Sequence, residues 1–147
     1  MIQIYTGKGK GKTTAALGLA VRAAGAGLKV FIAQFCKGRD SSELRILNDI
    51  QNITVKQFGR VCFISRHNPS CQDRNAAIQG LRMLSKIIAA GGYDVVILDE
   101  ITIALKFKLL KRKEVAEFFA NTPKHVELIL TGRYAPAWIL KKAELVS

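Results

Sequence analysis

The sequence has few of the residues that mark a disulfide scaffold, a disordered chain or a membrane protein. Its 147 residues include three cysteines without any C-x-x-C pair, which argues against a disulfide framework and a standard zinc knuckle. Three prolines and twelve glycines do not make a disordered composition. The apolar runs, such as Val95 to Leu98, fall far short of the ~20 residues that cross a bilayer. The composition therefore excludes membrane spanning and favours one globular domain over residues 1–147.

The first residues also lack a basic stretch ahead of an apolar core, so no export signal is recognisable and we expect a cytoplasmic protein. Acidic residues are scarce as well: 11 stand against 23 basic residues, which gives a net charge of +12. Such an excess predicts polyanionic partners, whether nucleic acid, phosphorylated small molecules or acidic protein surfaces. The positions of the basic residues must decide among these partners.

Short β-rich segments alternate with stretches of helical period along the chain. Strands are expected over residues 2–6, 29–35, 53–58, 93–99 and 126–131, and helices over 13–26, 40–49, around 77–90, around 115–119 and over 135–143. Continuously apolar strands indicate a parallel sheet that is covered on both faces. The predicted fold class is a three-layer α/β fold with a mainly parallel sheet of five or six strands. Ligands of such sheets bind beyond the carboxyl ends of the strands.

The first strand and the first helix are joined by a glycine-lysine loop, Thr6 to Thr14, with the sequence T-G-K-G-K-G-K-T-T. Glycines let successive backbone N–H groups point into one concavity, and the following helix presents its positive end there. Lys12 is placed to reach phosphate oxygens and Thr13 to put its hydroxyl on Mg²⁺. The usual G-x-x-x-x-G-K-[ST] spacing would put a glycine at Thr6, so we expect a shorter or differently shaped loop. The predicted phosphate-binding residues of the loop are Gly7, Lys8, Gly9, Lys10, Gly11, Lys12, Thr13 and Thr14.

Asp99 and Glu100 directly follow the most apolar strand and supply the acidic counterpart of the loop. A carboxylate at a neighbouring strand end can hold Mg²⁺ directly or through water, so Thr13, Asp99 and Glu100 are the predicted metal contacts. Two arginines, Arg133 after the last strand and Arg22 on the first helix, are further candidates for nucleotide contact, although each is equally compatible with a place on the surface.

Two other groups of residues are less specific. The basic run of Lys106, Lys108, Lys111, Arg112 and Lys113 has only Phe107 interleaved, so a solvated face is favoured over a nucleic-acid groove. Cys62, His67 and Cys71 lie around an Asn-Pro turn and are residue types that bind soft metal ions, but their spacing is irregular for a metal site. By default the cysteines are interpreted as small, buried hydrophobic residues.

Four segments together resemble the ATP:corrinoid adenosyltransferases of the P-loop type. The loop with the two alanines that follow it resembles that family's T-G-N-G-K-G-K-T-T-A-A loop, with Lys8 in place of asparagine. Residues 30–38 (V-F-I-A-Q-F-C-K-G) look like its second strand and turn, residues 94–102 (D-V-V-I-L-D-E-I-T) resemble its D-x-V-V-L-D-E-x-T segment, and residues 129–133 (I-L-T-G-R) its I-I-T-G-R.

The resemblance implies transfer of the 5′-deoxyadenosyl group of ATP to the cobalt of a reduced corrinoid, with release of tripolyphosphate. Lys12 and Thr13 would be the catalytic residues, ATP and Mg²⁺ the substrate and metal, a flavoprotein a possible reductant, and a homodimer the assembly. In that family an aromatic pair is thought to meet the corrinoid. This chain has only one aromatic residue in the corresponding segment, Phe63, which is therefore the predicted corrinoid contact.

Two other functions stay open at this point. The excess of basic residues is compatible with a nucleic-acid-dependent P-loop ATPase of RecA-like topology, although nucleic acid is not the partner we favour. A nucleotide-binding module that has lost its chemistry is the third reading.

Overall fold

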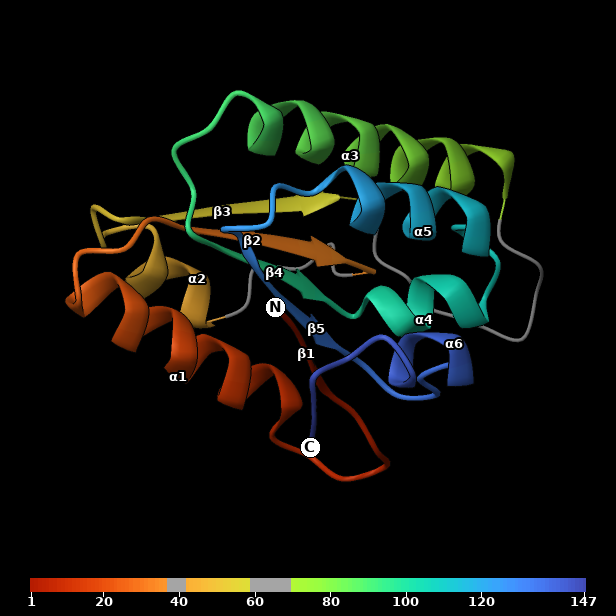
Figure 1. The fold of residues 1–147 in the computed structure, drawn as a ribbon, viewed down its shortest axis with the longest axis horizontal. Helices are drawn as coiled ribbons and strands as arrows, with labels where there is room; N and C mark the ends of the chain where they lie inside the picture. Colours follow the sequence, from red (N-terminus) through yellow and green to blue (C-terminus); the bar gives the residue numbers. More distant parts are fainter. Residues whose placement is uncertain (37–41, 59–69) are drawn as a thin grey trace.

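The computed structural model describes residues 1–36, 42–58 and 70–147, and shows an α/β fold in three layers (Figure 1). Within these residues the strands are β1 (Ile2–Tyr5), β2 (Val30–Phe35), β3 (Ile53–Phe58), β4 (Val95–Asp99), β5 (Glu127–Thr131) and β6 (Leu145–Val146). The helices are α1 (Lys12–Gly25), α2 (Ser42–Leu47), α3 (Cys71–Ala89), α4 (Ile101–Lys106), α5 (Arg112–Asn121) and α6 (Ala137–Leu140).

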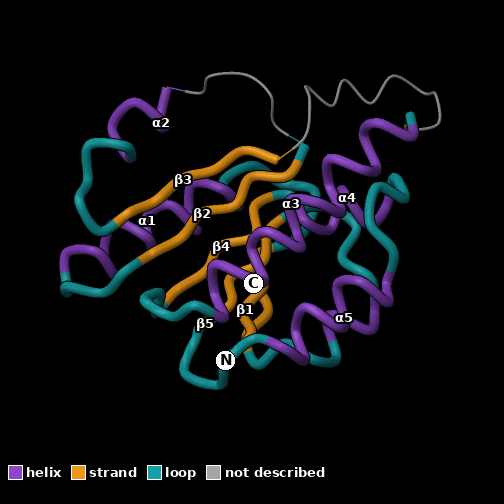
Figure 2. The backbone as a smooth tube through the Cα atoms, turned by 90° about the horizontal axis from the view of Figure 1, so that it is seen from above, coloured by secondary structure: helices purple, strands orange, loops and turns teal. Residues whose placement is uncertain are grey.

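The strands form one sheet in the order β3-β2-β4-β5-β1-β6, and every pairing is parallel. Figure 2 shows β3, β2 and β4 side by side in this sheet. The six residues of β2 are all buried, as are the five of β4. Continuous burial is what a parallel sheet with helices on both faces requires. The predicted fold class is therefore confirmed.

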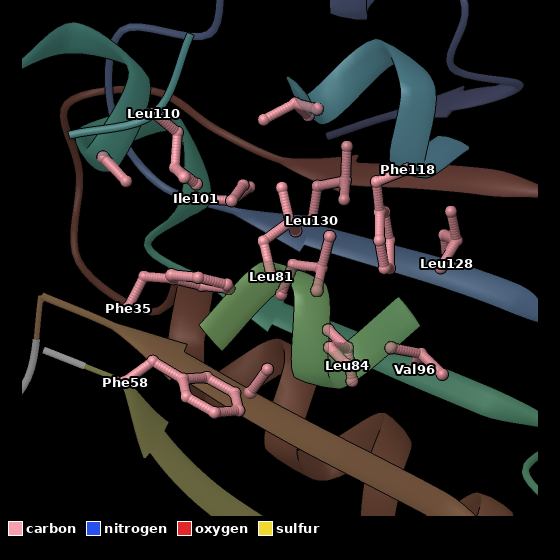
Figure 3. Close-up of a cluster of buried hydrophobic side chains, with 14 of the residues drawn as sticks. Phe35, Phe58, Leu81, Leu84, Val96, Ile101, Leu110, Phe118, Leu128 and Leu130 are labelled. Carbon is pink, nitrogen blue, oxygen red and sulfur yellow. The ribbon is translucent and has the colours of Figure 1, made fainter. Parts of the chain in front are cut away.

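The two faces of the sheet carry separate apolar clusters. Helices α1 and α2 cover one face, where Ala16 and Ala20 bring α1 close to the strands. Helices α3, α4, α5 and α6 lie on the other side, over a larger cluster that includes Phe35, Leu84 and Phe118 (Figure 3). A Cβ atom at Gly80 of α3 would come within 2.5 Å of the Phe58 ring, so the absence of a side chain there sets how closely α3 packs on β3. Among the described residues no helix is both long and apolar enough to cross a membrane.

Two predictions about helices were incomplete. Helix α4 was not expected, because Ile101 to Lys106 directly continues the apolar strand and is rich in β-branched residues. The last helix was predicted over 135–143, but α6 spans Ala137–Leu140. After it the chain turns back to the sheet, where the amide of Glu144 donates to the carbonyl of Ile2 and β6 pairs with β1. These contacts are tertiary, so local patterns carried no signal for them.

Candidate functional site

The carboxyl ends of the parallel strands bring the predicted loop and the predicted acidic residues to one edge of the sheet (Figure 1). The loop leaves β1 and enters α1 with Gly7 at φ 105° and Gly11 at φ 103°, conformations that residues with a Cβ rarely adopt. Gly11 caps α1 without a side-chain hydrogen bond, so the cap residue supplies no acceptor for the amides of the first helical turn. This helix end therefore presents backbone donors and a partial positive charge, which suits an anion.

The Lys12 side chain lies inside the loop. Its ammonium group donates to the carbonyl of Gly7 at 3.0 Å and also to the carbonyl of Gly9. The loop glycines and lysines from Gly7 to Gly11 are exposed, while Lys12 and Thr13 are half-buried. The structure thus gathers the loop residues predicted from the sequence around one positively charged turn.

Thr6 explains why the loop departs from the usual spacing. Its hydroxyl donates to the carbonyl of Gly132 at 2.8 Å, and the amide of Gly132 donates to the carbonyl of Tyr5. A glycine at position 6 could not make the first of these bonds. The start of the loop is therefore fastened to the end of β5.

Asp99 is the centre of a buried polar network. Its side chain is 0% exposed and accepts hydrogen bonds from the hydroxyls of Thr13 at 2.8 Å and Thr131 at 2.6 Å, both on the same carboxylate oxygen. The other oxygen accepts from the amide of Gln34 at 3.3 Å. Burial of a carboxylate is costly unless such donors surround it. The predicted pairing of Asp99 with the loop is thus realised through Thr13.

Two glutamines, to which the sequence patterns assign no role, extend this network. The sheet register aligns Gln57 of β3 with Gln34 of β2, and Gln34 with Asp99 of β4. Gln57 donates to Gln34 at 3.1 Å, so a chain of side-chain amides supports Asp99 from the side away from Thr13. The available signal was a glutamine inside the otherwise apolar run V-F-I-A-Q-F, since buried strands seldom carry an amide without a partner.

The remaining predicted residues fall into two groups. Glu100 is half-buried and has φ 61°, and its amide donates to the Thr131 hydroxyl at 2.9 Å. Arg133 is exposed on the turn after β5, where its carbonyl accepts a hydrogen bond from Thr102 at 2.6 Å. Arg22 is exposed near the far end of α1, roughly 15 Å along the helix axis from Lys12. The structure brings Glu100 and Arg133 to the edge with the loop but does not bring Arg22 there, so its role in nucleotide binding stays a prediction.

Phe63, Cys62 and His67 lie outside the described residues, and Cys71 is exposed at the first position of α3. Over residues 1–36, 42–58 and 70–147, no group of three or more His, Cys, Asp and Glu side chains is placed to hold a metal ion.

A glycine-rich loop between β1 and α1, with its lysine and threonine at the helix start and a buried aspartate on a neighbouring strand, is the arrangement of the P-loop class of proteins. A KaiC-like protein of Pyrococcus horikoshii shares the fold, with a TM-score of 0.57 and 18% identity over 90% of this chain and 62% of that one.

The sequence comparisons are more specific. Residues 1–147 match the family ATP:corrinoid adenosyltransferase BtuR/CobO/CobP. The corrinoid adenosyltransferase of Escherichia coli K12 and the corrinoid adenosyltransferase CobA of Salmonella typhimurium are each 33% identical to this chain, which covers 74% of their lengths. An uncharacterized protein of Nostoc sp. is 36% identical, and the chain spans 42% of it. The chain belongs to the ATP:corrinoid adenosyltransferase family, a family of transferases, as the four motifs indicated.

Proposed function

We propose that this protein transfers the 5′-deoxyadenosyl group of ATP to the cobalt of a reduced corrinoid and releases tripolyphosphate. The observation that carries the proposal is the hydrogen bond from Thr13 to the buried Asp99, in a chain that belongs to this family. That bond joins the phosphate loop to the acidic strand end. The family match does not favour the alternative of a nucleic-acid-dependent ATPase.

The proposed reaction is a displacement at carbon. A cobalt–carbon bond forms at the ribose 5′ carbon, the bond from that carbon to the phosphate oxygen breaks, and its electron pair leaves with the triphosphate. Negative charge therefore builds on the leaving group during the reaction. The positive loop, with Lys12 and the backbone amides of the α1 helix start, is suited to stabilise this charge. No proton has to be removed from the nucleophile, so the site needs no general base.

The residues at the strand ends fit a magnesium ion. The hydroxyl of Thr13 donates its hydrogen bond to Asp99, which leaves the oxygen lone pairs of Thr13 available to a hard cation. Asp99 is fully buried and both its oxygens already accept hydrogen bonds from protein side chains, so we assign it to orienting Thr13. Glu100 is the more accessible second carboxylate. When bound, Mg²⁺ would neutralise charge on the triphosphate.

The test is to identify the products. Protein, Mg-ATP and chemically reduced cobalamin should give adenosylcobalamin and tripolyphosphate in equal amounts. Formation of ADP and phosphate alone would contradict the proposal, and stimulation of that hydrolysis by DNA or RNA, with steep salt dependence, would support the ATPase instead. ATP binding without either turnover would indicate a binding module.

The proposal includes three further points. Cobalt must first reach its reduced state, for which we propose an external reductant of the flavoprotein type. We also propose a cytoplasmic location and a homodimer. The molar mass in solution, compared with the 16.2 kDa of one chain, tests the dimer.

A further inference from the structure

Four residues of the basic run, for which a solvated face is predicted, line a cavity: Lys106, Lys108, Lys111 and Arg112. A cavity of about 570 Å³ lies between α3, α4, α5 and α6, and we refer to it as the basic cavity. The described residues that line it are Arg74, Leu105, Lys106, Lys108, Leu110, Lys111, Arg112, Tyr134, Pro136 and Trp138. Five of these side chains are cationic and none is acidic. Like charges that converge in this way repel one another, and an anionic ligand would relieve the repulsion.

The cavity also has flat aromatic walls beside the charges. The ammonium nitrogen of Lys106 lies 5.4 Å from the centre of the Tyr134 ring, and the guanidinium carbon of Arg112 lies 5.4 Å from the centre of the Trp138 ring. Both distances are within the range of cation–π contacts, which hold the two cations in place. Tyr134 is 56% exposed, so much of its apolar surface remains free to meet a ligand.

Two strand-end turns connect the basic cavity to the nucleotide site. Tyr134 comes two residues after Gly132, whose carbonyl accepts the hydrogen bond from Thr6 of the loop. Lys106 ends α4, a helix of about 9 Å that begins immediately after Asp99 and Glu100. The cavity therefore opens beside the edge where the triphosphate would lie, and a second substrate at that edge would be within reach of it.

The size and chemistry of the cavity point to part of a small molecule. Its volume falls within the range of ligand pockets, about 300–1,000 Å³. Lysine and arginine bind carboxylates, while aromatic faces with Leu105 and Pro136 suit an apolar ring. A corrinoid combines the two features, because its macrocycle is apolar and its edge carries acid or amide side chains.

We propose that the basic cavity binds free carboxylates at the edge of the corrinoid, so that this enzyme favours corrinoids with acid side chains over fully amidated ones. The inference rests on the proposed function for the identity of the ligand. It assigns Lys106, Lys108 and their neighbours to specificity and leaves the chemical step to the phosphate loop.

Equilibrium dialysis of a corrinoid acid and of its fully amidated counterpart, detected by their own absorbance, tests the proposal. We expect the wild-type protein to bind the acid about tenfold more tightly. The double variant Lys106→Ala/Lys108→Ala should lose this preference, so that it binds the acid and the amidated form with similar affinity. The matched control Lys113→Ala/Lys124→Ala removes two exposed lysines that do not line the cavity, and it should keep the preference. A thermal melt checks that both double variants are folded.

Trp138 provides a second readout, because it is the only tryptophan of the chain and lies in the cavity wall. Its fluorescence, corrected for corrinoid absorbance, should respond to the acid in wild type and much less in the Lys106→Ala/Lys108→Ala variant. Equal affinity for both corrinoids, or a preference that survives in that variant, would overturn this inference and leave the proposed function intact. Binding of neither corrinoid would overturn both.

Discussion

Both edges of the sheet have turns with a left-handed backbone (positive φ), but different types of residue occupy these positions at the two edges. At the amino edge the left-handed positions are glycines, namely Gly27, Gly91 and Gly92. At the carboxyl edge they include Cys36, Glu100 and Tyr134, which follow β2, β4 and β5. A left-handed residue with a Cβ is about 1–2 kcal/mol less stable than glycine in the same place. The protein therefore tolerates strain at the edge that carries the phosphate loop, where side chains at the strand ends are needed.

The two edges also differ in how deeply their charged side chains are buried. Asp94 and Asp99 stand at opposite ends of the same strand region, and each carboxylate accepts hydrogen bonds. Asp94 is half-buried and accepts from the backbone amide of Lys29, whereas Asp99 is fully buried and accepts from three other side chains. The amino edge also has a cavity, of about 280 Å³, but the only charged residue among its described lining is Lys29. Of these two aspartates, the one at the carboxyl edge is therefore the one held in a buried network of side chains.

The largest effect is expected on the free energy of unfolding, when a glycine at each edge of the sheet is replaced by alanine. In Gly132→Ala the new Cβ would lie 2.2 Å from the Thr102 hydroxyl oxygen, at φ 134°. In Gly92→Ala, at φ 96°, the Cβ would meet nothing within 4 Å. We expect a loss of about 3 kcal/mol in the free energy of unfolding for Gly132→Ala and about 1 kcal/mol for Gly92→Ala, from urea denaturation. Equal losses would show that the carboxyl edge is no more tightly packed than the amino edge.

The second effect is on nucleotide affinity. Lys12→Ala removes the ammonium group from the loop and should weaken Mg-ATP binding about 100-fold, or about 2.7 kcal/mol, by calorimetry. Lys29→Ala removes an exposed lysine from the amino edge and serves as the control, with affinity expected to change less than twofold. A similar loss in both variants would mean that the general positive charge attracts the nucleotide rather than the loop.

The parts of the site that form from local sequence patterns could be predicted, whereas those that form by tertiary contacts could not. The loop and Asp99 were predictable, because a Gly-Lys-Thr helix start and an acid after an apolar strand are local patterns with a fixed place in a parallel sheet. The bond of Thr6 to Gly132 joins residues 126 positions apart and leaves no local trace. The basic run was visible too, but its convergence with Arg74 of α3 depends on how the helices pack.

The third effect compares two aspartates of one strand region. Asp99→Asn places an amide group in a site where three donors point at a carboxylate, so at least one donor loses its acceptor unless Gln34 and Gln57 both turn over. We expect a loss of about 2 kcal/mol in the free energy of unfolding and about tenfold weaker Mg-ATP binding. Asp94→Asn, the matched control, should change stability by less than about 1 kcal/mol and leave binding unchanged. If Asp99→Asn bound Mg-ATP as well as wild type, the orientation of Thr13 by this carboxylate would be excluded.

The smallest effect isolates backbone strain at the carboxyl edge. Glu100→Ala and Glu100→Gly both remove the carboxylate, and both keep the amide that donates to Thr131, but only glycine relaxes the left-handed backbone at φ 61°. Glu100→Gly should therefore be about 1 kcal/mol more stable than Glu100→Ala by urea denaturation. Gly91→Ala at the amino edge, at φ 82°, should shift stability by a similar amount in the opposite direction. If Glu100→Gly were no more stable than Glu100→Ala, residue 100 would carry no strain. The difference between the two edges would then lie in their side chains alone, because the backbone at the end of β4 would fit its conformation as readily as the glycines at the other end of the sheet.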